Sequence, residues 1–258
     1  MALWDRTEIR LEHLTSPEVG EALEAGYTTV VFACGAVEQH GPAIALSMDA
    51  EHGTALAHAV ARRLGNALVG PTLRIGCSEH HMGFAGTLTL REETFRAVVT
   101  DVVESLSRHG VRRIVILPTH GGNFAPLAAL VPELDAYPGT HVEAFTDLFR
   151  VMEVWQREAA VDGLAERVGG HADVAEASIM MAFHPDRVRP DRAEPGRVGP
   201  LDPEVSRRLF EEGMKAVSPN GVLGDARGMN PGLGRRLVEA LADAVVEGFG
   251  GGEPPPGG

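Results

Sequence analysis

Apolar positions along the chain alternate between short continuous runs and longer stretches in which they recur three and four residues apart. The short runs are typical of buried strands, and the longer stretches are typical of amphipathic helices. This pattern predicts strands at 28–34, 67–73, 112–117 and 141–146, and helices at 51–64, 92–109, 125–134, 174–183, 203–217 and 230–248.

The order of these elements indicates how they are connected. Strands that alternate with helices form parallel sheets joined by crossover helices, which predicts an α/β fold with a mostly parallel central sheet. We expect one domain over residues 1–248, in which the Pro-, Arg- and Gly-rich segment 185–200 is a long surface excursion. The Gly/Pro-rich tail 249–258 has almost no surface to bury and is expected to be disordered.

Composition and charge narrow the classes of function. A chain of 258 residues, 44% hydrophobic and 23% charged, can bury a sizeable core. A formal net charge of −13 argues against nucleic acid and against an anionic membrane surface as partners, because both attract clustered Lys and Arg. No apolar run approaches the roughly 20 residues that cross a bilayer, and residues 1–18 lack the apolar core of a signal peptide. We therefore expect a cytoplasmic protein.

A first polar cluster follows the strand at 28–34. Functional residues of open α/β sheets collect at the carboxyl ends of the strands, and the segment GAVEQHGP stands at such an end. Residues two apart in extended backbone project to the same side, so Glu38 and His40 can face one site together. Nine residues further on, Asp49 offers a second carboxylate at the start of the next helical region.

A second cluster follows the strand at 112–117. His120 precedes Gly121 and Gly122, which let backbone or substrate approach closely and can form a nest of N–H groups for an oxyanion. Asn123 can hydrogen-bond a substrate or cap the following helix. The alternative is an ordinary connection between a strand and a helix.

A third cluster, His171 and Glu176, stands where the helix at 174–183 begins. The two residues are five apart, so they can share a face if His171 lies at the cap rather than within the helix. The loop residues Glu79, His80 and His81 either line a pocket or are structural.

The three clusters together offer nitrogen and oxygen ligands without a thiolate, a set that suits Zn²⁺, Mn²⁺ or Fe²⁺ better than Ca²⁺. Five candidate ligands exceed the need of one catalytic zinc, and a bridging carboxylate from Asp49 makes two metals roughly 3.5–4 Å apart plausible. The remaining polar candidates are interpreted as surface, hydrogen-bonded or packing residues: His52, His58, His109, His141, His184, Cys34 and Cys77.

At these residues the chain resembles the creatininase (creatinine amidohydrolase) family. The resemblance covers residues 35 to about 240, and its segments occur in the order expected for the family. The matching segments are GAVEQHGP with Asp49, CSEHHMGFAGTLTLREETF, THGGNF, HADVAEASIMMAFHPDRV and NGVLGDARGMNPGLGRRL.

The resemblance implies a three-layer α/β/α sandwich with a dinuclear metal centre, acting on a small-molecule substrate and assembled as a ring-like homo-hexamer. By matching, Glu38, Asp49 and His120 would hold one ion, and His40 and Asp49 the second. His171 matches the catalytic histidine of the family, and Glu176 matches the glutamate of the same segment.

The chain also departs from the family pattern. Creatinine-cleaving members carry a metal-binding glutamate where this chain has Gly122, so Glu176 is expected to supply the missing carboxylate. Ala43 replaces a usual histidine, which argues against creatinine itself as the substrate. Asp173, Ala177 and Ala85 replace a glycine, a threonine and a proline, and the first two are expected to alter the wall of the pocket.

The expected reaction is hydrolysis of a carbon–nitrogen amide bond by a metal-activated water, with His171 passing a proton to the leaving nitrogen. Other hydrolases on the same scaffold stay open: a deformylase of a pterin or flavin precursor, a cyclic-ketone hydrolase, and a peptidase that trims a small modified peptide. A non-catalytic metal-binding protein and a carbon–carbon lyase are the alternatives from other classes.

Overall fold

The centre of the molecule is a parallel sheet of four strands. The computed structural model describes residues 3–136, 138–199 and 202–249. Its strands follow the order β2 (Ala67–Val69), β1 (Thr29–Cys34), β3 (Arg113–Pro118) and β4 (His141–Ala144), and each neighbouring pair is parallel. The four predicted strands are confirmed, although β2 and β4 are shorter than the apolar runs suggested.

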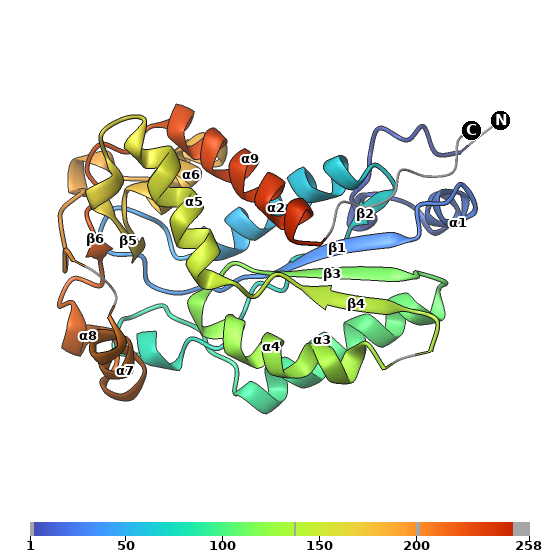
Figure 1. Ribbon diagram of the computed structural model, residues 1–258, viewed down its shortest axis with the longest axis horizontal. Coiled ribbons are helices and arrows are strands. Elements are labelled where there is room, and N and C mark those ends of the chain that lie inside the picture. The colour runs from blue at the N-terminus through green and yellow to red at the C-terminus, as the bar shows by residue number, and fades with distance from the viewer. Residues whose placement is uncertain (1–2, 137, 200–201, 250–258) are drawn as a thin grey trace.

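Helices cover both faces of this sheet (Figure 1). On one side lie α2 (Met48–Leu64), α6 (Val174–Phe183) and α9 (Pro231–Gly248), and on the other lie α3 (Glu92–Arg108) and α4 (Gly121–Leu134). All six residues of β1 are buried, as expected for a strand that is covered on both faces. The predicted three-layer α/β/α architecture is confirmed.

The register of β1 and β3 determines where the functional loops begin. Thr29 pairs with Arg113 and Cys34 pairs with Pro118, so the two strands end side by side. The segments 35–42 and 119–123 therefore leave the same edge of the sheet, which is the edge where polar side chains were expected to collect.

Several helices begin or end away from the predicted positions. The helix α2 starts at Met48 rather than 51, and α4 starts at Gly121 rather than 125, because both first turns are formed by residues without apolar periodicity. The predicted helix 203–217 is divided into α7 (Pro203–Glu212) and α8 (Met214–Val217). The break is at Gly213, whose φ of 88° lies outside the helical region.

Some elements have no counterpart in the sequence-based prediction. They are the helices α1 (Ser16–Glu24) and α5 (Leu148–Ala160), the antiparallel pair β5 (Val168–His171) and β6 (Leu223–Gly224), and the single 3₁₀ turns η1 (Leu11–His13), η2 (Glu79–His81), η3 (Ala165–Arg167), η4 (Pro185–Arg187) and η5 (Pro190–Arg192). The strands β5 and β6 are short and glycine-rich, so they lack the apolar alternation by which strands are recognised.

The segment 185–200 is held to the rest of the molecule by isolated bridges. Val188 is buried and pairs with Ile44, and Arg197 pairs with Leu223. The tail predicted to be disordered at 249–258 lies outside the described residues, apart from Phe249. Within the described ranges, no helix is both long and apolar enough to cross a membrane.

Helices α6 and α9 pack closely where α9 carries a glycine. A Cβ atom added at Gly234 would lie 2.0 Å from the carbonyl oxygen of Ser178 on α6. Two helices can approach this closely only if one of them lacks a side chain at the crossing. Glu176 stands on α6, so this packing also helps to position the helix that carries it.

We expect Gly234→Ala to lower the free energy of unfolding by about 1–3 kcal/mol, because the methyl group forces the helices apart. Gly20→Ala is the matched control, since Gly20 is also helical but its added Cβ would meet nothing within 4 Å. The control should gain about 0.5–1 kcal/mol from the lower flexibility of the unfolded chain. Urea unfolding of both variants measures the difference, and equal effects would contradict the close packing.

Candidate metal centre

The chain that leaves β1 brings Glu38 and His40 into one buried site. Both side chains are almost fully buried, at 0% and 1% exposure. Nδ1 of His40 lies 3.1 Å from the carbonyl oxygen of Glu38, so this nitrogen is used locally and Nε2 faces the site. The prediction that these two residues face the same site agrees with this geometry.

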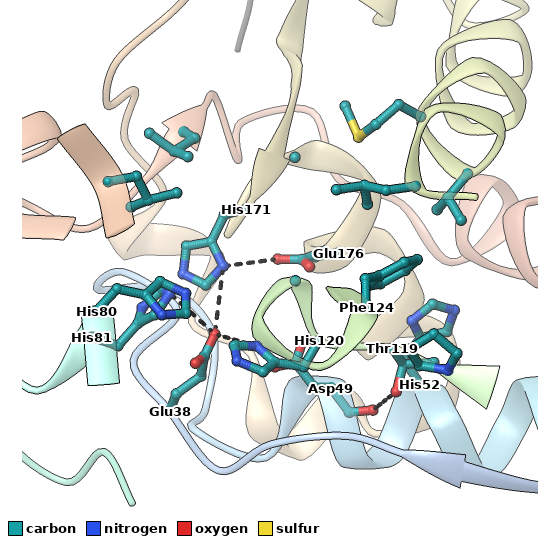
Figure 2. A pocket seen from close by; sticks show the side chains of 18 of the residues that line it. Glu38, Asp49, His52, His80, His81, Thr119, His120, Phe124, His171 and Glu176 are labelled. Atoms are coloured by element: carbon teal, nitrogen blue, oxygen red, sulfur yellow. Dashed lines mark hydrogen bonds and ion pairs between the residues drawn. The ribbon is translucent and has the colours of Figure 1, made fainter. Parts of the chain in front are cut away.

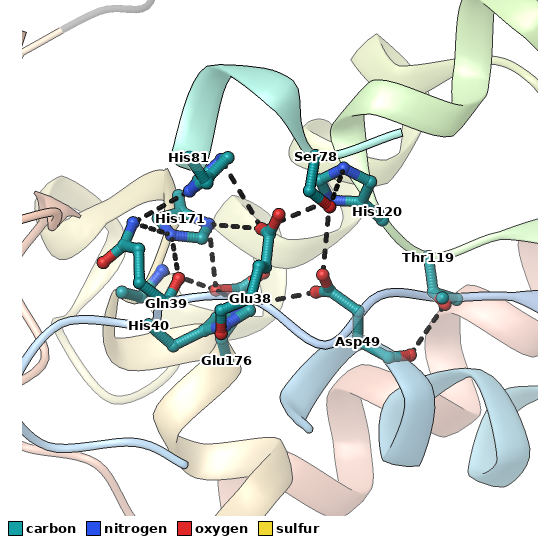
Figure 3. Close-up of polar contacts among 12 residues, drawn as sticks. Glu38, Gln39, His40, Asp49, Ser78, His81, Thr119, His120, His171 and Glu176 are labelled. Carbon is teal, nitrogen blue, oxygen red and sulfur yellow. Dashed lines mark hydrogen bonds and ion pairs between the residues drawn. The ribbon is translucent and has the colours of Figure 1, made fainter. Parts of the chain in front are cut away.

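Asp49, in the first turn of α2, lies between two imidazoles. Its Oδ1 is 3.2 Å from Nε2 of His40, and its Oδ2 is 3.3 Å from Nδ1 of His120 (Figure 3). Thr119 donates a hydrogen bond to the backbone oxygen of Asp49, so the segment after β3 also fixes the start of α2. A carboxylate in this position can share its two oxygens between two cations.

His120 is the residue that precedes α4, and its ring is oriented by the loop before η2. Nε2 lies 3.0 Å from the carbonyl oxygen of Cys77 and 3.2 Å from Oγ of Ser78. Nδ1 therefore faces the carboxylates, 3.2 Å from Oε1 of Glu38. An outer hydrogen bond that fixes one ring nitrogen and presents the other is typical of histidines that bind metals.

Gly122 lies directly against this loop. A Cβ atom there would be 2.0 Å from the carbonyl oxygen of Cys77 and 2.7 Å from Nε2 of His120. The position therefore has no room for any side chain, including the glutamate that creatinine-cleaving members carry. The carboxylate that is missing at 122 has to come from another element.

Glu176, in the first turn of α6, supplies a carboxylate at the site. Its Oε2 lies 3.6 Å from Nε2 of His40 and accepts a hydrogen bond from the backbone N–H of Ala172. His171 ends β5 and lies outside the helix, two residues before the cap of α6 at Asp173. Its Nδ1 lies 3.8 Å from Oε1 of Glu38 and 4.0 Å from Oε2 of Glu176 (Figure 2).

Asp173 caps α6 instead of forming a wall of the pocket. Its buried carboxylate accepts hydrogen bonds from the backbone N–H groups of Gly169, Gly170, Ala175 and Glu176. Neither Asp173 nor Ala177 lines the cavity at the site, so the expectation that they alter its wall is wrong. The aspartate ties the end of β5 to the start of α6, which positions both His171 and Glu176.

Burial and neighbouring charges together raise the pKa values of three of the clustered groups. Burial alone would lower the pKa of His40, but Asp49 and Glu176 outweigh it and raise the pKa to about 10. The carboxylates of Glu38 and Asp49 likewise raise the pKa of His120 against the effect of burial. Burial, with the charge of Asp49, raises the pKa of Glu176 to about 8. The site therefore binds protons strongly when it holds no other cation.

The donor set fits divalent cations. Three groups of ligand atoms lie within 4.8 Å of one another: Glu38, Asp49 and His120; His40, Asp49 and Glu176; and Glu38, His40 and His171. Both carboxylate oxygens of Glu38 and Oδ2 of Asp49 are buried without a hydrogen-bond partner among the described residues. Buried carboxylate oxygens without partners are costly, and cations bound between them would remove that cost.

A cavity of about 130 Å³ opens onto the cluster. Of the residues expected to contact substrate, Gly121, His80 and His81 line it, whereas Glu79 is exposed and lies outside its wall. Much of the remaining wall is apolar and comes from Phe124 of α4 and from helices α5, α7 and α8.

Asn123 is used within the chain. Its Oδ1 accepts a hydrogen bond from the N–H of Cys77, and its Nδ2 donates to the carbonyl oxygens of Cys34 and Gly35. These bonds hold the loop before η2 against the end of β1. The contact between Asn123 and substrate stays a prediction. The geometry argues against it, because the side-chain amide is already used in these hydrogen bonds.

Gln39 is a site residue that the sequence did not single out. Its side-chain nitrogen lies 2.8 Å from Nε2 of His171, 3.0 Å from Nδ1 of His81 and 3.1 Å from the carbonyl oxygen of Gly221. In extended backbone, neighbouring side chains point to opposite sides, so the sequence predicts that Gln39 points away from the site of Glu38 and His40. The contact therefore depends on the conformation of the chain after β1, which the sequence pattern does not give.

The interpretation of His52 as a surface or hydrogen-bonded residue is wrong. It is 3% exposed, and neither of its ring nitrogens has a hydrogen-bond partner among the described residues. The cysteines agree with a packing role, because burial raises the pKa of both thiols and disfavours the reactive thiolate.

Comparisons with known proteins agree with the site. The family model for Creatininase, described as creatinine amidohydrolase, matches residues 12–249. A mycofactocin precursor peptide peptidase of Mycobacterium ulcerans is 29% identical, with 91% of this chain and 92% of that protein covered. A creatinine amidohydrolase of Pseudomonas putida is also 29% identical, over 92% of this chain and 95% of that protein.

Solved structures show the same fold. A crystal structure of creatinine amidohydrolase (creatininase) superposes with a TM-score of 0.74 at 26% identity, covering 97% of this chain and 100% of that chain. A manganese creatininase superposes with a TM-score of 0.73 at 26% identity, over 96% and 100% of the two chains. The chain therefore belongs to the creatininase family and is a hydrolase.

Proposed function

We propose that this protein hydrolyses an amide bond at a centre of two divalent ions. The observation that carries the proposal is the convergence of three carboxylates and two imidazoles, with buried carboxylate oxygens that lack a hydrogen-bond partner among the described residues. Glu38, Asp49 and His120 would hold one ion, and His40, Asp49 and Glu176 the other, with Asp49 shared. Zn²⁺, Mn²⁺ and Fe²⁺ suit this set of nitrogen and oxygen ligands.

When bound, such ions lower the pKa of water towards neutrality and polarise the carbonyl group that is attacked. The chain itself supplies the proton transfer. Nε2 of His171 lies 2.9 Å from the backbone oxygen of Gln39, which can only accept. The side-chain amide nitrogen of Gln39 is also near, but its two N–H groups can donate to Gly221 and to Nδ1 of His81, so we assign the proton to Nε2 and the lone pair to Nδ1. In the metal-free site, burial and the charge of His40 hold the pKa of His171 well below its usual value.

In the proposed reaction, water adds to the carbonyl carbon and its proton passes to Nδ1 of His171. The same nitrogen then delivers the proton to the leaving nitrogen as the carbon–nitrogen bond breaks. Gln39 is a positioning residue, because its backbone and side chain both lie against Nε2 of His171. Glu176 faces the same nitrogen, Nδ1, at 4.0 Å.

We favour an amide of a small peptide, or of a peptide-derived molecule, over creatinine as the substrate. The position of Gly122 has no room for a glutamate, and Ala43 stands where creatinine-cleaving members carry histidine. The apolar wall of the cavity suits a hydrophobic substituent beside the amide. The relatives named mycofactocin precursor peptide peptidase support the same choice. Assembly as a homo-hexamer and a location in the cytoplasm stay predictions.

Removing one ligand tests the metal centre. We expect elemental analysis to find about two divalent ions per subunit. His120→Ala should lose at least one ion and lower the turnover of a peptide-amide panel at least about 100-fold, since the remaining ligands cannot hold the ion pair. His109→Ala, at an exposed histidine, is the control. Wild-type protein without stoichiometric metal, or full turnover by His120→Ala, would refute the proposal.

Metal binding should release protons. His40 and Glu176, with pKa values of about 10 and about 8, both hold protons at pH 7 in the metal-free site, and these compete with the ion. Raising the pH removes the competing protons, so affinity for Mn²⁺ should rise between pH 6 and pH 8. Calorimetry in buffers with different ionisation enthalpies counts the protons released. An affinity that does not change with pH over this range would contradict the assignment of these ligands.

His171→Asn distinguishes proton transfer from metal binding. We expect kcat to fall about 100- to 10,000-fold with the metal content unchanged, because Asn cannot accept and return the proton. Steady-state kinetics and elemental analysis of the same preparation provide both values, with His109→Asn as the control. Loss of one ion from His171→Asn would instead assign His171 to the ligand group with Glu38 and His40.

A further inference from the structure

One part of the cavity wall contains polar atoms that have no hydrogen-bond partner in the described part of the chain. His52 on α2 and Trp155 on α5 are 3% and 5% exposed, and both line the cavity. Nδ1 and Nε2 of His52 and Nε1 of Trp155 have no hydrogen-bond partner among the described residues. Three buried nitrogens without partners in one small region are costly, and such groups are usually satisfied by water or a ligand.

The two side chains form one unit. Their ring centroids are 5.5 Å apart and the ring planes meet at 49°. His52 is three residues beyond Asp49 on α2, so it lies about one helical turn, or about 4.5 Å along the helix axis, from that candidate ligand. Figure 2 shows His52 beside Thr119, on the other side of Phe124 and Asp49 from His80, His81 and His171. His52 therefore lies away from these three histidines in the cavity wall.

The space between the metal ligands and this unit suits an apolar group. Phe124, Leu148, Val151 and Met152 contribute to the wall of the cavity. The whole cavity, including its part beside the metal ligands, has a volume of about 130 Å³, and an apolar cavity of about 150 Å³ binds one benzene ring, so the substituent can be no larger than one ring. A substrate with a ring-sized apolar body can thus extend from the metal centre towards His52 and Trp155.

The chemistry of the unit selects a neutral polar group at the end of that body. Burial lowers the pKa of His52 to about 4, so at neutral pH its ring offers one N–H donor and one acceptor. Trp155 adds one donor. No Lys or Arg is among the described residues that line the cavity, so a carboxylate would be buried there without a countercharge.

We propose that His52 and Trp155 form a specificity subsite that binds a neutral hydrogen-bonding group, such as a hydroxyl or a primary amide, at the far end of an apolar substituent of the substrate. The subsite rests on the proposed function, since the reacting amide of the same substrate has to lie at the metal centre. The two residues act in recognition and take no part in bond cleavage.

Hydroxamic acids test the subsite, because they chelate divalent ions and can carry the substituent into the cavity. We would measure the binding of 3-phenylpropanohydroxamic acid and of its 4-hydroxy, 4-carboxamide and 4-carboxylate derivatives to the metal-loaded protein by calorimetry. The hydroxy or carboxamide compound should bind about five- to tenfold more tightly than the parent, as expected for one neutral hydrogen bond to a buried group. The carboxylate should bind more weakly than the parent.

His52→Phe and Trp155→Phe keep an aromatic ring and remove the nitrogens. Each variant should bind the parent compound with wild-type affinity and lose most of the preference for the neutral polar derivative, and thermal unfolding checks that both remain folded. Equal affinity of the wild type for the parent and both neutral derivatives, or a preference that survives in both variants, would reject the subsite alone. If no hydroxamic acid binds, the metal centre and the subsite that depends on it are both rejected.

Discussion

The burial of Glu38 and Asp49 opposite several imidazoles is the interaction on which the rest of the site depends. Isolated carboxylates in such a place are unstable, so each has to be neutralised by protons, by cationic histidines or by metal ions. The raised pKa values of both His40 and Glu176 show that the site favours bound protons when no other cation is present. A centre of this kind holds protons when it is empty and exchanges them for cations, which makes binding and protonation a single equilibrium.

Parallel strand pairing brings these groups together. Because β1 and β3 end in register, the loops after them start side by side, and Glu38 and His120 come within 3.2 Å although they are far apart in sequence. His171 and Glu176 come from a different region of the chain. There Asp173 joins the end of β5, which carries His171, to the start of α6, which carries Glu176. Helix α6 is in turn held close to α9 by the contact between Gly234 and Ser178.

The departures from the family pattern have physical causes that can be traced in the fold. Gly122 is required because the carbonyl oxygen of Cys77 occupies the space of a side chain, and the same carbonyl orients the ring of His120. The carbonyl oxygen of Cys77 thus has two effects: it orients the ring of His120, and it excludes a side chain at position 122. Glu176 brings a carboxylate to the site from another element, with Oε2 3.6 Å from Nε2 of His40.

The sequence by itself determined the class of fold, the four parallel strands and the residues of the polar clusters, because periodicity and strand ends are local properties. It left open whether His171 stands at the cap of the helix that carries Glu176 or within it. Only the tertiary structure decided that Asp173 is a cap, that Gln39 contacts His171, and that both nitrogens of His52 are buried with no hydrogen-bond partner among the residues that the structure describes. These three features depend on contacts between segments distant in sequence, and a residue's local pattern contains no information about which distant group will lie beside it.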